Sequence, residues 1–157
     1  MSDPDAASGP ARRHLVVCDL DGTLADIEHR LHWIHREEPD WTEFFVACVD
    51  DTPIEPTIVV LRALHAEGYE VVLASGRGEV ARHETIDWLA RHGVPWDRLV
   101  LRRSGDLRHD DEVKAEMVRE HGLDPAETLV VFEDRASVVK MWRRLGFHVF
   151  QVAEGDF

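Results

Sequence analysis

The chain has 157 residues, of which 44% are hydrophobic and 31% are charged, a composition typical of one ordinary globular domain. Its 18 basic and 31 acidic residues give a formal net charge of −13, which argues against a broad, non-specific grip on nucleic acid but leaves room for a local basic cleft. No apolar run approaches the ~20 residues of a membrane-spanning helix, and no signal peptide precedes the first apolar run. The two cysteines, Cys18 and Cys48, form no disulfide framework, so we expect a cytoplasmic protein without membrane contact.

Residues 1–12 are rich in Asp, Ser, Gly and Pro, a composition typical of a loose tail. An apolar run at residues 14–18 predicts a short buried strand, and Gly22-Thr23 predicts the loop that ends it. We therefore expect a single domain over residues 13–157 that begins with this strand.

Two aspartates stand one residue apart where this strand stops. Paired like charges are costly unless a cation or a proton lies between them, and a divalent metal with a phosphate ester meets that need. Asp19 would then be a nucleophile towards phosphorus, and Asp21 a general acid and base on the leaving oxygen. As an acid near neutral pH, Asp21 needs surroundings that raise its pKa above the usual value of about 3.9. The alternative is a polar loop with two solvated acids.

The next thirty residues predict a small helical insert. Helical patterns cover residues 26–36 and 41–49, and Asp40 with Glu43 has the spacing of a capping box for the second. An insert of residues 25–52 is too small for a globular cap domain. We expect a flap over one side of the site that leaves its mouth open to a bulky substrate.

Strands and helices alternate through the rest of the chain. Short apolar, β-branched runs predict strands at residues 70–75, 98–101, 128–132 and 147–152. Helices are predicted from Pro56 to Gly68 and over residues 79–92, 111–121 and 136–145. This alternation predicts an α/β fold, with a central parallel sheet, helices on both faces and right-handed crossovers.

Polar side chains follow several of these strands. In such sheets, ligands bind outside the carboxyl ends of the strands, where helix N-termini also point. The segment Ser75-Gly76-Arg77 follows the second long strand and offers a hydroxyl, flexible amides and a guanidinium that suit phosphate oxygens. Lys114 lies in the first turn of its helix, and Glu133 and Asp134 follow the fourth of these strands. We expect all of them to meet the aspartate pair in one site.

As an ordered set, these motifs resemble the haloacid dehalogenase (HAD) superfamily of aspartyl-phosphate phosphatases over residues 14–157. The second half of the chain is similar to the 3′-phosphatase domain of bacteriophage polynucleotide kinase. The residues that carry this similarity are Gly105-Asp106, Asp110-Asp111, Val113-Lys114, Asp134-Arg135, Val138-Val139, Met141 to Arg144, Gly146, Gln151 to Ala153 and Gly155 to Phe157. The resemblance implies a HAD-like Rossmannoid three-layer sandwich with a small helical flap in place of a full cap domain.

The resemblance also implies a function. It points to a Mg²⁺-dependent phosphoric monoester hydrolase that removes 3′-phosphates from DNA or RNA ends through a phosphoaspartate. By position, Asp19 would be the nucleophile, Asp21 the acid and base, and Ser75 and Lys114 would bind the transferring phosphate. The implied Mg²⁺ ligands are Asp19, Asp134 and the backbone carbonyl of Asp21, with Glu133 as a competing ligand. Arg30, Arg77 and Asp110 also fall on functional positions of that family.

Three features depart from the family pattern. The sequence has no Gly-x-x-x-x-Gly-Lys-Ser/Thr loop, so we expect no ATP site, and a kinase or ligase would be separately encoded. Glu133 stands where the family has Asp, and the flap from residue 29 to 51 matches poorly. Two other functions therefore stay open. One is a small-molecule phosphatase acting on nucleotides or sugar phosphates, which the net charge favours, and the other is a non-catalytic phosphate-binding module.

Several residues admit two interpretations. The spacing of His29, His32 and His35 suggests zinc, although solvated flap residues fit better because no cysteine accompanies them. Trp33 and Trp41 either stack on a nucleobase or, as we favour, pack the flap against the core.

The charged candidates are equally open. Arg30 is either a phosphate contact or a surface charge, and Asp110 either orients Lys114 or Arg77 or caps its helix. One basic concentration stands near the expected cleft and either follows a nucleic acid backbone or is a solvated face; its members are Arg98, Arg102, Arg103 and Arg108.

Overall fold

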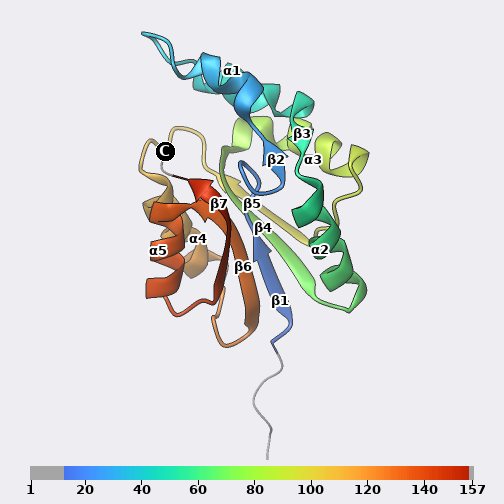
Figure 1. Ribbon diagram of the computed structural model, residues 1–157. Coiled ribbons are helices and arrows are strands. Elements are labelled where there is room, and N and C mark those ends of the chain that lie inside the picture. The colour runs from blue at the N-terminus through green and yellow to red at the C-terminus, as the bar shows by residue number, and fades with distance from the viewer. Residues whose placement is uncertain (1–12, 156–157) are drawn as a thin grey trace, which may run out of the picture.

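The computed structural model describes residues 13–155, and its centre is a parallel sheet of five strands (Figure 1). The strands are β1 (Leu15–Cys18), β4 (Glu70–Gly78), β5 (Arg98–Arg102), β6 (Thr128–Arg135) and β7 (Val149–Gly155), in the spatial order β5-β4-β1-β6-β7. Every neighbouring pair in this sheet is parallel, which confirms the prediction from the alternation of strands and helices. The predicted tail, residues 1–12, lies outside the described residues.

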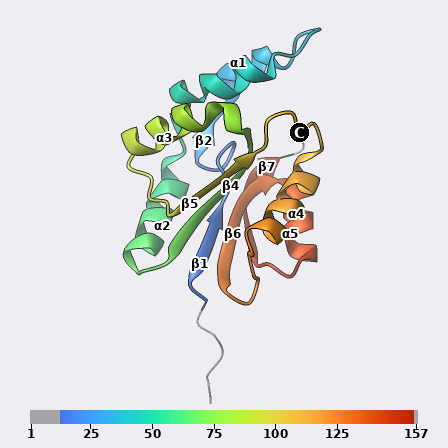
Figure 2. The same cartoon turned by 180° about the vertical axis from the view of Figure 1, so that it is seen from behind.

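Helices cover both faces of the sheet (Figures 1 and 2). One face carries α2 (Glu55–Ala66) and α3 (Arg82–Arg91), and the other carries α4 (Asp110–Glu120) and α5 (Ala136–Arg144). The alternation of side chains along a strand explains this arrangement. In β1, Val16 packs with α2 and α3, whereas Val17 packs with α4 and α5. A strand that is buried on both faces must be apolar throughout, and β1 is.

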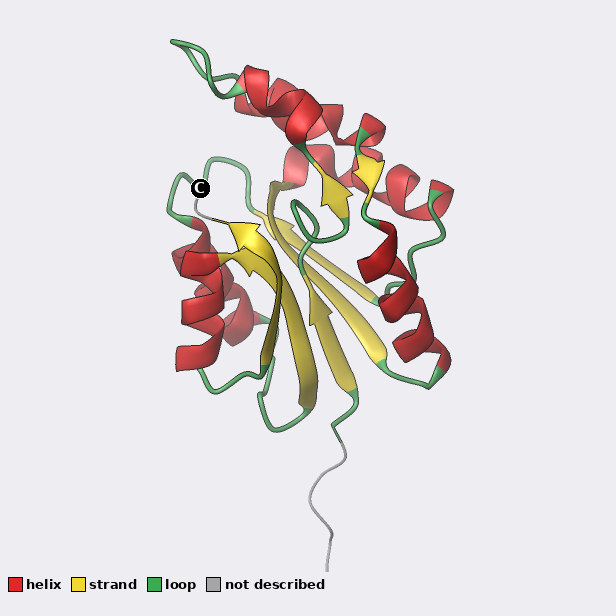
Figure 3. Ribbon diagram, viewed as in Figure 1, coloured by secondary structure: helices red, strands yellow, loops and turns green. Residues whose placement is uncertain are grey.

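The flap lies across the carboxyl ends of the strands (Figures 1 and 3). Its two ends are joined by a small antiparallel pair, β2 (Ala25–Asp26) and β3 (Thr52–Pro53), which the sequence pattern did not indicate. Between them lie the 3₁₀ helix η1 (Glu28–Trp33), the short helix α1 (Trp41–Val46) and the 3₁₀ helix η2 (Ala47–Asp50).

Of the two α-helices predicted in the flap, the first is replaced by the 3₁₀ helix η1, and the second, α1, begins at the predicted residue. Residues 26–36 form no α-helix, because Asp26 pairs with Thr52 in the small sheet and its side chain accepts the amide of Glu28 at 2.9 Å. Asp40 caps α1 as expected, since its carboxylate accepts the backbone amide of Glu43 at 3.0 Å. Trp88 of α3 anchors the flap by donating its indole N–H to the carbonyl of Asp51 at 2.8 Å.

The two strands that carry predicted site residues run further than expected. From the apolar runs, we expect these strands to end at residues 75 and 132, but β4 continues to Gly78 and β6 continues to Arg135. In each, the pairing register shifts near the predicted end, between Ala74 and Gly78 in β4 and between Glu133 and Arg135 in β6. Such irregularities re-aim side chains, and here they occur where the polar residues begin. No helix within residues 13–155 has the length and apolar character needed to cross a membrane.

Candidate active site

Three buried carboxylates meet at the carboxyl ends of β1 and β6. Asp19, Glu133 and Asp134 each offer an oxygen, and these oxygens all lie within 4.8 Å of one another. Burial, and then the neighbouring Glu133, raises the pKa of Asp19 to about 8. Burial, and then Asp19, raises the pKa of Asp134 to about 6. Three acids crowded in this way repel one another, and a cation between them would relieve that repulsion.

Lys114 supplies one positive charge from the beginning of α4. Its ammonium lies 2.9 Å from Oδ1 of Asp19 and 2.7 Å from Oε2 of Glu133, and its side chain is buried. Burial alone would lower the pKa of Lys114, but Asp19 and Glu133 raise it above its ordinary value, so the side chain stays charged. Oδ1 of Asp19 is buried and has no hydrogen-bond partner besides this ion pair. A cation bound beside it would satisfy that oxygen.

The Gly-Thr that follows the aspartate pair holds Asp134. Gly22 has a φ of +82°, a conformation that residues with a Cβ rarely adopt. A Cβ added there would also lie 2.7 Å from Cγ of Asp134, so only glycine lets this carboxylate approach the loop. Thr23 then donates its hydroxyl to Oδ1 of Asp134 at 3.1 Å. This loop therefore orients a predicted metal ligand.

The carboxylate cluster fits a hard divalent cation. Asp19, Glu133 and Asp134 were all predicted as ligands, and carboxylate oxygens are what Mg²⁺ prefers. Glu133 is already engaged by Lys114 and accepts the backbone amides of Asp134 at 3.2 Å and Arg135 at 3.3 Å. Asp19 and Asp134 thus have more coordination capacity left than Glu133. The side chain of Asp21 points elsewhere and is not a member of this cluster.

Asp21 is held by two buried arginines. Its Oδ1 accepts a hydrogen bond from Nη2 of Arg30 at 2.6 Å and another from Nη2 of Arg77. Asp51, at the end of the flap, faces the same guanidiniums, accepting Nε and Nη2 of Arg30, both at 2.8 Å. Arg77 donates further to the hydroxyl of Thr85 at 3.0 Å. Arg30 is therefore a buried ion-pair residue, not a surface charge.

These contacts overturn one expectation about Asp21. Burial raises its pKa, but the charges of Arg77 and Arg30 outweigh burial and lower the pKa to about 2. The expected upward shift is therefore wrong for this arrangement, because two guanidiniums share one carboxylate oxygen. The network also includes Asp51, which sequence reasoning missed. One sequence feature could have indicated it: two adjacent acids, Asp50 and Asp51, stand directly before β3, the strand that ends the flap.

Asp19 and Asp21 open into a cavity of about 720 Å³. Ser75, Gly76 and Arg77, the residues predicted to bind phosphate, also line this cavity. The hydroxyl of Ser75 accepts the amide of Arg77 at 3.1 Å, which shapes this turn. The guanidinium of Arg77, however, lies against carboxylates, which gives it a positioning role on Asp21.

Asp110 contacts neither of its predicted partners. It is the first residue of α4, whose N-cap is His109, and it forms ion pairs with Arg102 and, at 2.8 Å, with Arg135. It therefore does not cap the helix, and its link to Lys114 is electrostatic, because its charge adds to those of Asp19 and Glu133 in raising the pKa of Lys114 above its ordinary value. Gly76 leaves room for its carboxylate, since a Cβ there would lie 2.8 Å from Cγ of Asp110.

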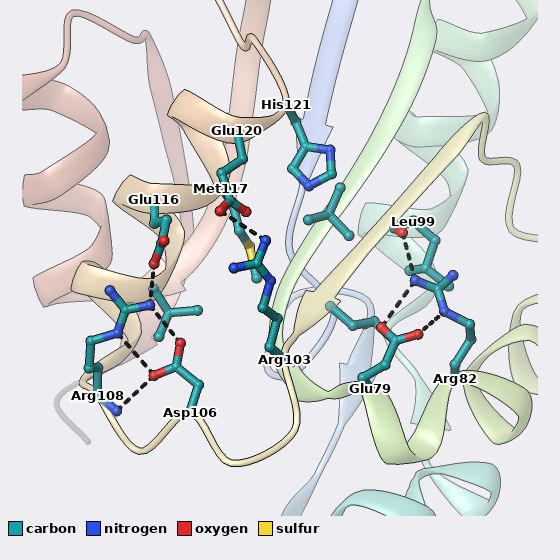
Figure 4. Close-up of a pocket in the computed structure, with 13 residues that line it drawn as sticks. Glu79, Arg82, Leu99, Arg103, Asp106, Arg108, Glu116, Met117, Glu120 and His121 are labelled. Carbon is teal, nitrogen blue, oxygen red and sulfur yellow. Dashed lines mark hydrogen bonds and ion pairs between the residues drawn. The ribbon is translucent and has the colours of Figure 1, made fainter.

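The basic run is neutralised by neighbouring acids, as Figure 4 shows for two of its members. Arg103 pairs with Glu120 at 2.9 Å, and Arg108 pairs with Asp106 at 2.7 Å and with Glu116. These pairs border a second, smaller cavity of about 270 Å³ beside β5. Arg98 begins β5 and therefore lies at the amino ends of the strands, where it pairs with Glu70 at 2.8 Å. The four arginines from residue 98 to 108 thus do not form one continuous basic surface.

The three histidines do not assemble a zinc site. Among residues 13–155, the carboxylate cluster is the only group of three candidate ligands that lie close together. His29 instead contacts Oδ1 of Asp51 at 2.7 Å, and Nδ1 of His32 lies 3.0 Å from the carbonyl of His29. The histidine spacing reflects the short η1 turn rather than a ligand set.

Comparisons with known proteins agree with this geometry. A family model described as the phosphatase domain of polynucleotide kinase PNKP matches residues 13–157. A chain in the solved structure of a Pnkp1/Rnl/Hen1 complex is 32% identical with a TM-score of 0.81, over 99% of this chain and 50% of that chain. A protein of Autographa californica nuclear polyhedrosis virus, described as a bifunctional polynucleotide kinase/RNA ligase, is 24% identical over 131 residues, which are 83% of this chain and 18% of the viral protein.

More distant structures share the fold. A class C acid phosphatase from Bacillus anthracis is 21% identical with a TM-score of 0.63, over 84% of this chain and 56% of that chain. A phosphatase from Clostridium difficile is 14% identical with a TM-score of 0.62, over 89% of this chain and 85% of that chain. This chain thus spans about half the length of the Pnkp1-complex chain and less than a fifth of the viral protein.

Proposed function

The chain belongs to the family of PNKP phosphatase domains, which have the HAD fold, and from this premise we propose that it is a Mg²⁺-dependent polynucleotide 3′-phosphatase. We propose that residues 13–157 act as one phosphatase unit, with residues 25–52 as its flap. The observation that carries the proposal is the carboxylate of Asp19, which lies 2.9 Å from the buried ammonium of Lys114 and lines the same cavity as Asp21.

In the first step, an oxygen of Asp19 attacks phosphorus, and the bond from phosphorus to the ester oxygen breaks. Lys114 offsets the negative charge that gathers on the phosphoryl oxygens, and Ser75 lies on the wall where those oxygens would bind. When bound by Asp19 and Asp134, Mg²⁺ supplies further positive charge at the nucleophile and the phosphate. Asp21 gives its proton to the leaving oxygen.

In the second step, water attacks the phosphoaspartate, its proton passes to Asp21, and Asp19 is released. This step needs Asp21 as a carboxylate, the state in which Arg30 and Arg77 hold it. For the first step it must be protonated, and the approach of a dianionic phosphate favours that state by raising its pKa. General acid and base catalysis of this kind contributes about 10²- to 10⁴-fold to the rate.

The names of the similar proteins support a nucleic acid end as substrate. Both the family model and the viral relative are described by their action on polynucleotides. One structure named above is that of a Pnkp1/Rnl/Hen1 complex, which supports a kinase or ligase as partner. The net charge of −13 and the ion-paired arginines favour a second candidate, a phosphatase of mononucleotides.

Phosphate release from a short 3′-phosphorylated oligonucleotide tests the proposal. The panel includes the same oligonucleotide with a 5′-phosphate, nucleoside 3′-monophosphates and a sugar phosphate, each with Mg²⁺ and with EDTA. We expect Mg²⁺-dependent release from the 3′-phosphates. Release from sugar phosphates but from neither DNA nor RNA 3′-phosphates overturns the nucleic acid substrate. No release from any ester overturns the phosphatase and leaves the non-catalytic phosphate-binding module.

A further inference from the structure

Exposed apolar side chains gather at the mouth of the catalytic cavity. Within residues 13–155, eight large hydrophobic side chains are exposed, and three of them line this one cavity. Trp41 is 50% exposed and comes from α1, Val80 is 50% exposed and comes from the 3₁₀ helix η3 (Glu79–Ala81), and Leu107 is 89% exposed and comes from the loop between β5 and α4. Exposed apolar residues are ordinarily scattered singly, so three on one rim indicate a binding surface.

The indole of Trp41 is held in place by its neighbours. Its ring centroid lies 5.8 Å from that of Phe44, edge to face, and 6.0 Å from that of Phe45. Phe45 in turn packs against Gly78 at the end of β4, where a Cβ would lie 2.8 Å from the nearest atom of its ring. The aromatic cluster therefore ties the exposed indole to the sheet. Trp33, the other tryptophan of the flap, does not line the cavity.

The facing loop is also fixed. Arg102 donates to the carbonyl of Gly76 at 2.8 Å, to that of Arg108 at 2.7 Å and to that of Asp106 at 3.1 Å, so it clamps the loop that carries Leu107. The other arginines of this loop form ion pairs with neighbouring acids, which offset part of their charge (Figure 4). The mouth therefore combines exposed apolar side chains with ion-paired arginines.

From these observations, and resting on the proposed function, we propose that Trp41, Val80 and Leu107 form an apolar collar that binds the nucleoside attached to the scissile phosphate. The base lies on the indole of Trp41 while the phosphate meets Asp19 deeper in the same cavity. Stacking is tolerant of base identity, because every base has a π-face. A cavity of about 720 Å³ is large enough for a nucleotide. The collar therefore makes the enzyme select nucleotides over other secondary phosphate esters.

Two esters with the same kind of leaving group test the collar. Thymidine 3′-phosphate and glycerol 2-phosphate are both monoesters of secondary alcohols, but only the first carries a base. For Trp41→Ala, we expect KM for thymidine 3′-phosphate to rise between about 5- and 150-fold with kcat unchanged, and KM for glycerol 2-phosphate to stay the same. Leu107→Ala should raise KM for thymidine 3′-phosphate by a smaller factor than Trp41→Ala does. Trp41→Phe should keep KM for thymidine 3′-phosphate close to that of the wild type. Phe150→Ala, which removes a similarly exposed aromatic from β7, is the matched control and should leave both substrates unchanged.

A binding measurement separates the collar from the proposed function. In the Asp19→Asn background, calorimetry gives Kd for each ester without turnover. If the wild type releases phosphate from no ester, the 3′-phosphorylated oligonucleotide included, but Trp41→Ala still weakens binding of thymidine 3′-phosphate alone, the phosphatase proposal fails and the collar stands. Equal losses for both esters, or no loss for either in folded Trp41→Ala, overturn the collar. Thermal melting of each variant confirms that it is folded.

Discussion

Replacing Gly22 with alanine moves Asp134, a proposed metal ligand, and leaves the proposed reacting groups Asp19 and Asp21 unchanged. Gly22 has a φ of +82°, and an alanine there is strained by about 1–2 kcal/mol. For a domain of this size, that strain lowers the melting temperature by roughly 2–8 °C. The same Cβ would lie 2.7 Å from Cγ of Asp134, whereas carbon atoms in contact stay about 3.5 Å apart. Asp134 must therefore move by about 1 Å.

A displacement of that size is large for a metal site, where ligand distances vary by about 0.2 Å. We expect the Mg²⁺ concentration for half-maximal phosphate release to rise about 10- to 100-fold in Gly22→Ala, the range seen when residues that orient metal ligands are changed. Half-maximal Mg²⁺ is measured by titrating the metal into EDTA-treated enzyme at saturating substrate.

Gly68→Ala is the matched control. Gly68 has a φ of +94° but nothing lies within 4 Å of an added Cβ, so it carries the backbone strain without the contact. Both variants should lose similar melting temperature, and only Gly22→Ala should need more Mg²⁺. The same half-maximal Mg²⁺ in the two variants would refute the reasoning that Gly22 exists to admit Asp134.

Three further outcomes follow from the site. Asp19→Asn should abolish phosphate release and keep the fold, and turnover near that of the wild type would contradict a covalent mechanism. Asp134→Asn should raise half-maximal Mg²⁺ more than Glu133→Gln does, because Glu133 is already bound to Lys114 and to backbone amides; the reverse order in a metal titration would exchange their roles. In EDTA, the melting temperature should fall as the pH rises from about 4 to about 8, because Asp19, with a pKa of about 8 when folded against 3.8 ordinarily, keeps a proton that the unfolded chain has lost. Melting curves of Asp19→Asn should show a weaker fall, and an unchanged slope would rule out Asp19 as its source.

Much of the fold, and many of the residues that meet in the candidate site, could be predicted from the sequence. Strands buried on both faces must be apolar throughout, so the runs at residues 14–18 and 128–132 predicted central strands that the structure confirms. Since parallel strands point the same way, the acids after them had to share one edge of the sheet. The placement of Asp19 beside Glu133 and Asp134 needed no more than that.

The flap was harder to predict, because its local preferences are weak and its anchors are distant. The helical pattern at residues 26–36 does not produce an α-helix, because β2 pairs with β3 and so joins the two ends of the insert. Trp41 was expected to pack inward, yet half of its surface stays exposed at the cavity mouth. Hydrophobic composition alone does not distinguish a core residue from one that lines a binding surface.

The sequence by itself determined the parallel sheet, the edge at which its acids gather and the residue types of a phosphatase, because these depend on local apolar runs and on strand direction. Only the tertiary structure decided which charges pair. Arg30 is 21 residues from Asp51, and Arg77 is 56 residues from Asp21, so no periodicity connects them. A buried guanidinium is costly without a carboxylate, and the fold decides which carboxylate comes within reach. For that reason Asp21 has a pKa near 2 instead of a raised one, and the arginines near the cavity neutralise acids instead of forming a basic track.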